Sequence, residues 1–126
     1  MDLTLQRPGD HLFIRAISDE GIQVGEEWYS EPLIISATSL VTDWDTRSVE
    51  DLHPHSFDQI FELRPEVVLI GTGTRQQFPP MELMMEFYRR GIGAEVMSTT
   101  AACRTFNVLV SEQRLVVAAL MPLTPC

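Results

Sequence analysis

The chain contains no lysine, and all nine of its basic residues are arginines. A lysine is required for Schiff-base catalysis, for a lysine general base and for the lysine-bearing phosphate loop of nucleotide hydrolases, so these three chemistries are excluded. Eighteen acidic residues against nine basic ones give a formal charge of −9. Such a charge repels phosphate backbones and anionic lipid. We therefore expect neither a nucleic-acid partner nor direct membrane insertion.

The chain is also poor in cysteine and in long apolar runs. Two cysteines, Cys103 and Cys126, are too few for a disulfide framework or a thiolate zinc site, which favours a reducing compartment. The longest apolar stretch, residues 115–121, is far shorter than the roughly 20 residues of a membrane-spanning helix. Asp2 stands where a secretory signal would carry positive charge. We expect a cytoplasmic protein, and the length predicts one domain over residues 1–126.

The first half of the chain has the composition of β-strands. Its apolar and β-branched segments alternate in part, and Gly21 lies at a turn that predicts a hairpin. Residues 47–63 then change to a helical pattern, in which Ser48 and Ser56 are predicted helix caps and Pro65 ends the helix. The predicted strands are residues 12–17, 22–25, 33–36 and 39–44.

The second half predicts a β-α-β-α-β order. Buried apolar runs alternate with segments that have helical periodicity, which favours right-handed crossovers and a mostly parallel sheet. The β-rich first half must then extend or cover that sheet. In the first of the two helices, Met81, Met84, Met85 and Tyr88 share one face, and we expect that face in the core. The predicted elements are strands 67–70, 94–97 and 115–121, a helix from Pro79 and Pro80 to Gly91, and a helix from Thr99 or Thr100 to about Glu112.

Two segments are candidates for an anion or ligand pocket. The loop of residues 71–75 follows a strand, at the position where open α/β sheets collect ligands. The segment of residues 99–105 opens a helix, whose free N–H groups favour an anion. The loop matches neither G-x-G-x-x-G nor G-K-[ST], so a simple tight turn is the alternative. The candidate pocket residues are Gly71, Thr72, Gly73, Arg75, Thr99, Thr100, Cys103, Arg104 and Asn107.

Cys103 has two alternative interpretations. Its place near the start of a helix and beside Arg104 would lower the pKa of the thiol and favour a nucleophile or a redox sensor. The neighbouring alanines instead favour an inert core cysteine, which we prefer. Cys126 is expected to be a loose exposed thiol.

His53, Pro54 and His55 raise the hypothesis of a metal site, with Asp51 and Asp58 as further ligands. The spacing matches no established zinc pattern, and a surface turn explains it equally well. We therefore predict no metal site and no cofactor.

The sequence resembles a known family at residues 71–73 and 77–80, and above all at residues 91–97 and at the A-A-C-R-T-F-N motif of residues 101–107. It is similar to a small bacterial and archaeal family that includes the mitochondrial respiratory complex I assembly factor 3. The resemblance implies a single three-layer α/β domain around a mixed sheet. Two departures are Ser98, where the family favours aspartate, and Phe106, where tyrosine is common. The family-typical positions are Gly71, Gly73, Cys103, Arg104, Thr105 and Asn107.

The resemblance also implies a function without catalysis. The mitochondrial relatives are non-enzymatic assembly factors that act with a paralogous partner, and no catalytic residue can be carried over. The first hypothesis is therefore a binding or assembly factor for respiratory complex I (NADH dehydrogenase), with respiratory complex subunits or other assembly factors as partners. The alternative is a ligand-binding domain or minor enzyme that uses the Gly71 loop and the Thr99 helix start. A homodimer through a sheet edge or an apolar patch is a further expectation.

Overall fold

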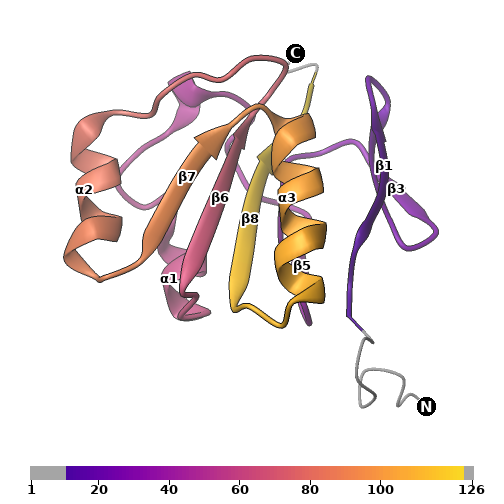
Figure 1. The fold of residues 1–126 in the computed structure, drawn as a ribbon. Coiled ribbons are helices and arrows are strands. Elements are labelled where there is room, and N and C mark those ends of the chain that lie inside the picture. The colour runs from indigo at the N-terminus through magenta and orange to yellow at the C-terminus, as the bar shows by residue number, and fades with distance from the viewer. Residues whose placement is uncertain (1–10, 124–126) are drawn as a thin grey trace.

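A computed structural model describes residues 11–123 of the chain (Figure 1). Its middle layer is a five-stranded mixed sheet with strand order β5-β4-β8-β6-β7. β6 runs parallel to both β8 and β7, whereas β4 runs antiparallel to β8. The strands of this sheet are β4 (Leu33–Ser36), β5 (Leu40–Val41), β6 (Val67–Thr72), β7 (Gly93–Met97) and β8 (Val116–Met121).

A second, smaller sheet is formed by the first three strands, which are all antiparallel: β1 (Ile14–Ser18), β2 (Gly21–Val24) and β3 (Glu27–Tyr29). The predicted hairpin at Gly21 is confirmed, because Ser18 pairs with Gly21. Gly21 has φ +142, and an added Cβ would lie 2.4 Å from the carbonyl oxygen of Tyr29. Glycine is therefore needed at this turn.

The helices cover both faces of the central sheet (Figure 1). α1 and α2 lie against one face, and α3 lies with the small sheet against the other. The expected three-layer α/β fold around a mixed sheet is confirmed. None of the helices within residues 11–123 is both long and apolar enough to cross a membrane. The helical elements are a 3-10 turn, η2 (Val49–Asp51), and the α-helices α1 (Asp58–Glu62), α2 (Met81–Arg89) and α3 (Thr99–Ser111).

Two hydrophobic clusters fill the spaces on either side of the central sheet. Strand side chains alternate between the faces, so Leu69 packs toward α3 while Val68 and Ile70 pack toward α1 and α2. Phe106 anchors the α3 side and Phe87 the α2 side, and each is almost fully buried. Burying such a side chain contributes about 1.5–3 kcal/mol, so the packing on both faces holds the strand ends in place.

The prediction that the methionine face of α2 lies in the core is wrong, except for Met84. Phe87 points inward instead, flanked by the half-buried Leu83 and Met84. Phe87 faces inward because α2 lies at the edge of the sheet and packs against α1. The ring centroids of Phe87 and Phe61 are 5.1 Å apart. Only one side of the helix is therefore covered. The residues left exposed are Met81 at 73 %, Met85 at 37 % and Tyr88 at 77 %.

The predicted cap of α3 is also corrected. Neither Thr99 nor Thr100 is the N-cap, because both lie inside the helix. The cap is Ser98, whose Oγ accepts a hydrogen bond from the N–H of Ala101 at 3.3 Å. An aspartate would accept the same bond, so the departure from the family at this position preserves the capping function.

The predicted caps in residues 47–63 differ as well. Ser48 does precede η2, but its side chain makes no cap bond. Ser56 lies two residues before α1, and its Oγ accepts the N–H of His53 at 2.9 Å. The residue at the cap position of α1 is Phe57. Ser56 thus orders the turn before the helix rather than the helix itself.

Candidate functional site

Gly71 and Thr72 belong to β6 rather than to the predicted loop, and the carboxyl end of this strand meets the start of α3, as the sequence predicts. An added Cβ on Gly71 would lie 2.9 Å from the Cα of Thr99, so the helix touches the strand backbone. The N–H of Gly73 donates to Thr99 Oγ1 at 2.7 Å, and the N–H of Thr99 donates to the Gly73 carbonyl at 2.8 Å. Thr99 Oγ1 in turn donates to the carbonyl of Met121 at 2.7 Å. These bonds close the space between the loop and the helix.

Thr72 closes the loop from its other side. Its hydroxyl donates to the carbonyl of Arg75 at 2.6 Å and accepts the N–H of Gln77 at 3.0 Å. Thr72 is buried, and its hydroxyl also lies 3.2 Å from the carbonyl of Met97 at the end of β7, so the polar partners of this hydroxyl all belong to the protein itself. The loop is a tight turn stabilised by its own side chain, which was the alternative to a ligand loop.

The two arginines expected to hold an anion do not converge. Arg75 lines a shallow recess of about 210 Å³ together with Arg47, whose guanidinium is already paired with the Glu31 carboxylate. Arg104 is exposed and does not line this recess. Ligand pockets are commonly 300–1,000 Å³ in volume. The geometry therefore does not support the ligand-pocket alternative.

Cys103 and Asn107 have structural roles in α3, while Thr100 is half-buried in its first turn. Cys103 is 4 % exposed, and burial raises the pKa of its thiol from 9.0 to about 12, which outweighs the opposite effect of Arg104. The burial of Cys103 agrees with the core interpretation and does not favour the alternative of a reactive thiolate. Asn107 Oδ1 accepts the N–H of Ile14 at 2.9 Å, and its Nδ2 donates to the Ile14 carbonyl at 2.7 Å. Cys126 lies outside the described residues.

The two histidines of the His-Pro-His turn point to different carboxylates. His53 Nε2 lies 3.2 Å from Asp45 Oδ2, and His55 Nδ1 lies 3.0 Å from Asp58 Oδ2. The hydrogen bond from His53 is the main cause that lowers the pKa of Asp45. Within residues 11–123, no group of three or more His, Cys, Asp or Glu side chains is placed to hold a metal.

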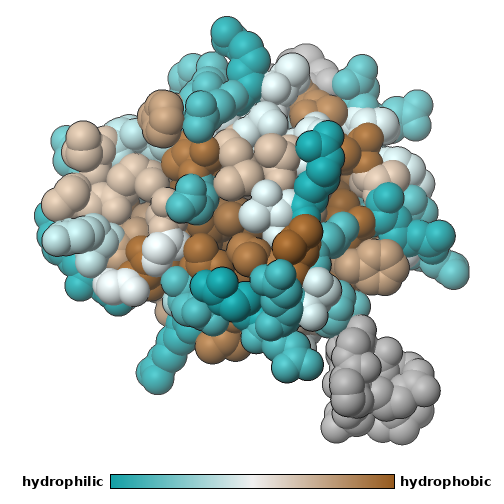
Figure 2. Space-filling view, viewed as in Figure 1, coloured by the Kyte–Doolittle hydropathy of each residue, from teal (hydrophilic) through white to brown (hydrophobic). Residues whose placement is uncertain are grey.

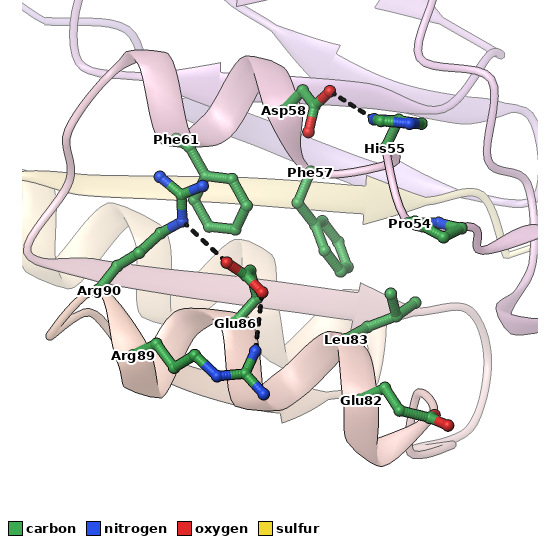
Figure 3. A pocket seen from close by; sticks show the side chains of 10 residues that line it. All are labelled: Pro54, His55, Phe57, Asp58, Phe61, Glu82, Leu83, Glu86, Arg89 and Arg90. Carbon is green, nitrogen blue, oxygen red and sulfur yellow. Dashed lines mark hydrogen bonds and ion pairs between the residues drawn. The ribbon is translucent and has the colours of Figure 1, made fainter.

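A groove that no sequence motif indicates lies between α1 and α2 (Figure 3). This groove of about 390 Å³ has an apolar lining of Phe57, Phe61 and Leu83. Its rim charges are largely paired: Glu86 bonds Arg89 at 2.9 Å and lies 3.6 Å from Arg90. The Arg90 guanidinium also lies 3.9 Å from the Phe61 ring centroid. A groove of this kind is suited to an apolar group rather than to proton transfer.

An apolar stripe covers the outer face of α2 and the loop before it. We define the α2 stripe as Phe78, Met81, Met85 and Tyr88, all of which are exposed. Tan side chains gather on this side of the molecule in Figure 2. Phe78 is 71 % exposed. Methionine and aromatic residues are enriched in protein interfaces, so the α2 stripe is a surface suited to a protein partner.

Two relatives illustrate what the chain is similar to. The 13 kDa major membrane protein of Francisella tularensis is 35% identical over 94 residues, which cover 74% of this chain and 75% of that protein. NADH dehydrogenase [ubiquinone] 1 alpha subcomplex assembly factor 3 of Danio rerio is 40% identical over 84 residues, or 65% of this chain and 48% of that factor. This chain therefore spans about half the length of the assembly factor.

A solved structure and a family model also match this chain. An NMR structure of a Xanthomonas campestris protein superimposes with a TM-score of 0.83 at 36% identity, covering 98% of this chain and 93% of that one. A family model described as a protein of unknown function, DUF498/DUF598, matches residues 14–121. This range includes all four segments that carry the resemblance, and the predicted family resemblance is confirmed. The chain belongs to the DUF498/DUF598 family.

Proposed function

We propose that this protein is a non-enzymatic binding factor that assists the maturation of respiratory complex I. One observation carries the proposal: the chain is 40% identical over 84 residues to a protein named as an assembly factor of NADH dehydrogenase. Because the match covers 48% of that factor, the proposal concerns the function of the shared domain. The respiratory complex subunits or their other assembly factors are the proposed partners.

The geometry supports a binding role over a catalytic one. Thr99 occupies the position where a ligand would approach the Gly71 loop, and burial holds the Cys103 thiol in its neutral form. The α2 stripe, in contrast, leaves large apolar side chains in solvent, where a protein partner would bury them.

We include in the proposal that the protein acts in the cytoplasm, which fractionation of cells under low and high salt would test.

A deletion strain tests the proposed function directly. We expect native gels of its membranes to show less assembled complex I and NADH-dependent respiration to fall, with both restored by the intact chain. Affinity purification of the tagged chain should recover complex I subunits. Unchanged assembly in the deletion strain, with no such subunit recovered, would contradict the proposal.

A further inference from the structure

β7 leaves one of its edges open. It is the last strand of the central sheet, with β6 as its one neighbour. The N–H of Gly93 donates to the Glu66 carbonyl at 3.1 Å, so the backbone groups of Gly93 face β6. Successive residues of a strand present these groups to opposite sides, so those of Ala94 and Val96 face outward. An open edge of this kind pairs with another extended chain.

An amide group already binds this edge. The side-chain Nε2 of Gln76, in the loop before α2, donates to the Val96 carbonyl at 2.8 Å. Within residues 11–123, neither the N–H nor the carbonyl of Ala94 has a hydrogen-bond partner outside the β6–β7 ladder. Gln76 therefore occupies one of the positions that a backbone amide of an added strand would take.

The α2 stripe forms an apolar wall beside the open edge. Met81, Met85 and Tyr88 recur at i, i+4 and i+7 on one side of α2. Glu86 and Arg90 line the groove toward α1 on the other side. The stripe therefore lies on the side of α2 away from α1, and α2 itself lies next to β7, the outermost strand of the sheet (Figure 1). A strand added to β7 would place alternate side chains against this wall.

The negative charge at this surface favours a basic partner over a second copy of the chain. Glu95 is the charged residue of β7, it is exposed, and it forms no ion pair with a residue among 11–123. The whole chain carries a formal charge of −9. A second copy paired through β7 would bring two acidic chains and two Glu95 carboxylates together, which is unfavourable. A basic segment is complementary to the same surface.

We propose that β7 binds an extended, basic segment of a partner protein by strand addition. The segment pairs its backbone with Ala94 and Val96 and displaces the Gln76 amide. Its apolar side chains pack on the α2 stripe, and a lysine or arginine lies opposite Glu95. This inference rests on the proposed function for the identity of the partner, but the interface itself is measurable without that partner.

The test titrates the intact chain with a synthetic peptide of alternating lysine and valine, monitored by NMR and by amide hydrogen exchange. We expect shifts in β7 and along α2, with slower exchange of the Ala94 and Val96 amides. A glutamate–valine peptide of the same length should bind about tenfold more weakly, and added salt should reduce that difference. A lysine–valine peptide with central prolines, which cannot pair as a strand, should produce no protection.

Two variants locate the binding surface. Glu95→Arg should reverse the preference, so that the glutamate–valine peptide becomes the tighter ligand. Asp19→Arg, in the turn between β1 and β2, changes the net charge equally and should leave the preference unchanged. Met85→Asp should weaken both peptides by about tenfold through loss of the apolar wall. Because these side chains are exposed, the variants should fold, which their amide spectra would verify.

Several results would overturn the inference: shifts confined to the α1–α2 groove, equal affinity for both peptides, or a dimer of the chain that forms through β7.

The deletion strain separates this inference from the proposed function. If Met85→Asp and Glu95→Arg restore complex I as well as the intact chain does, the interface is wrong and the function stands. If deletion has no effect on complex I while peptide binding follows Glu95, the function is wrong and the interface stands.

Discussion

The hydroxyl of Thr99 closes the carboxyl edge of the central sheet, where a ligand would otherwise bind. Its hydroxyl joins three segments, because it accepts from the loop at Gly73 and donates to the end of β8 at Met121. The side chain is fully buried, so neither of these backbone groups has access to water in its place. The same hydroxyl that stabilises the fold thus fills the space that a bound anion would need.

Replacing Thr99 with valine should lower the free energy of unfolding by about 2–6 kcal/mol. Valine keeps the shape but leaves a buried N–H and a buried carbonyl without partners, each at a cost of about 1–3 kcal/mol. Urea unfolding measures the change. Thr99→Ser retains the hydroxyl and should lose less, while Thr100→Val, one residue along the helix, should stay within about 0.5 kcal/mol of the original. Equal effects at both positions would contradict this role.

Cys103 should resist alkylation in the folded protein. The residue is 4 % exposed and the pKa of its thiol is raised to about 12 by burial, so the thiolate that reacts with iodoacetamide is scarce and inaccessible at neutral pH. A Cys126→Ser variant removes the second thiol, which allows mass spectrometry to report on Cys103 alone. We expect no labelling until urea unfolds the chain; prompt labelling in buffer would refute the core assignment.

The same thiol should make stability depend on pH in the alkaline range. Between about pH 9 and 12 the unfolded chain releases this proton while the folded chain retains it, so the folded state binds more protons. The free energy of unfolding is unaffected by this group below pH 9 and should fall as the pH rises above it. Urea midpoints from pH 7 to 10 measure the slope. Cys103→Ala should show a shallower slope, whatever its stability at pH 7.

At the scale of elements, Asn107 connects α3 to the small sheet. Its side-chain amide both accepts from and donates to the backbone of Ile14, as a neighbouring strand would. We expect Asn107→Ala to destabilise the protein by about 1–3 kcal/mol and to speed amide exchange in β1 more than in β6. Asn107→Asp places a carboxylate oxygen against the Ile14 carbonyl in place of the donating Nδ2, so we expect it to destabilise the protein at least as much as Asn107→Ala. Uniform acceleration across both sheets would contradict a local connection.

The elements of the second half were predictable because their signals are local. The apolar run that begins at Val67, the prolines before Met81 and the glycine at 91 each mark a boundary through short-range backbone preferences. Which side of α2 faces inward was not predictable, since that depends on where the helix meets the sheet edge and α1. The separate three-stranded sheet was missed for the same reason: its position depends on packing against α3, far along the chain.

In the candidate site, too, some features were predictable from local sequence and others depend on contacts between distant segments. The order of strands and helices was enough to predict that Gly71 and Thr99 lie close together. Whether they enclose a pocket depends on one hydroxyl that bridges positions 26 residues apart in sequence. The groove between α1 and α2 and the open edge of β7 likewise arise from contacts between distant segments, for which the sequence contains no local signal.

At the scale of the whole molecule, the excess of acidic residues opposes folding. Surface pairs such as Glu86–Arg89 and Glu66–Arg114 offset part of this repulsion, but each exposed pair contributes only about 0–1 kcal/mol. Eighteen acidic residues against nine arginines leave the molecule with a large excess of negative charge. Repulsion should therefore outweigh attraction in the response to salt.

Raising the ionic strength from about 0.01 M to about 0.1 M shortens the Debye length from about 30 Å to about 10 Å. We expect the free energy of unfolding to rise by a few tenths to about 1 kcal/mol over this range, measured by thermal or urea unfolding. Glu20→Arg with Glu26→Arg, both exposed and each adding two positive charges to −9, gives −5 and should weaken the dependence. A stability that falls with salt would mean that the paired charges, not the unpaired acids, dominate the surface, and it would remove the electrostatic reason for a basic partner.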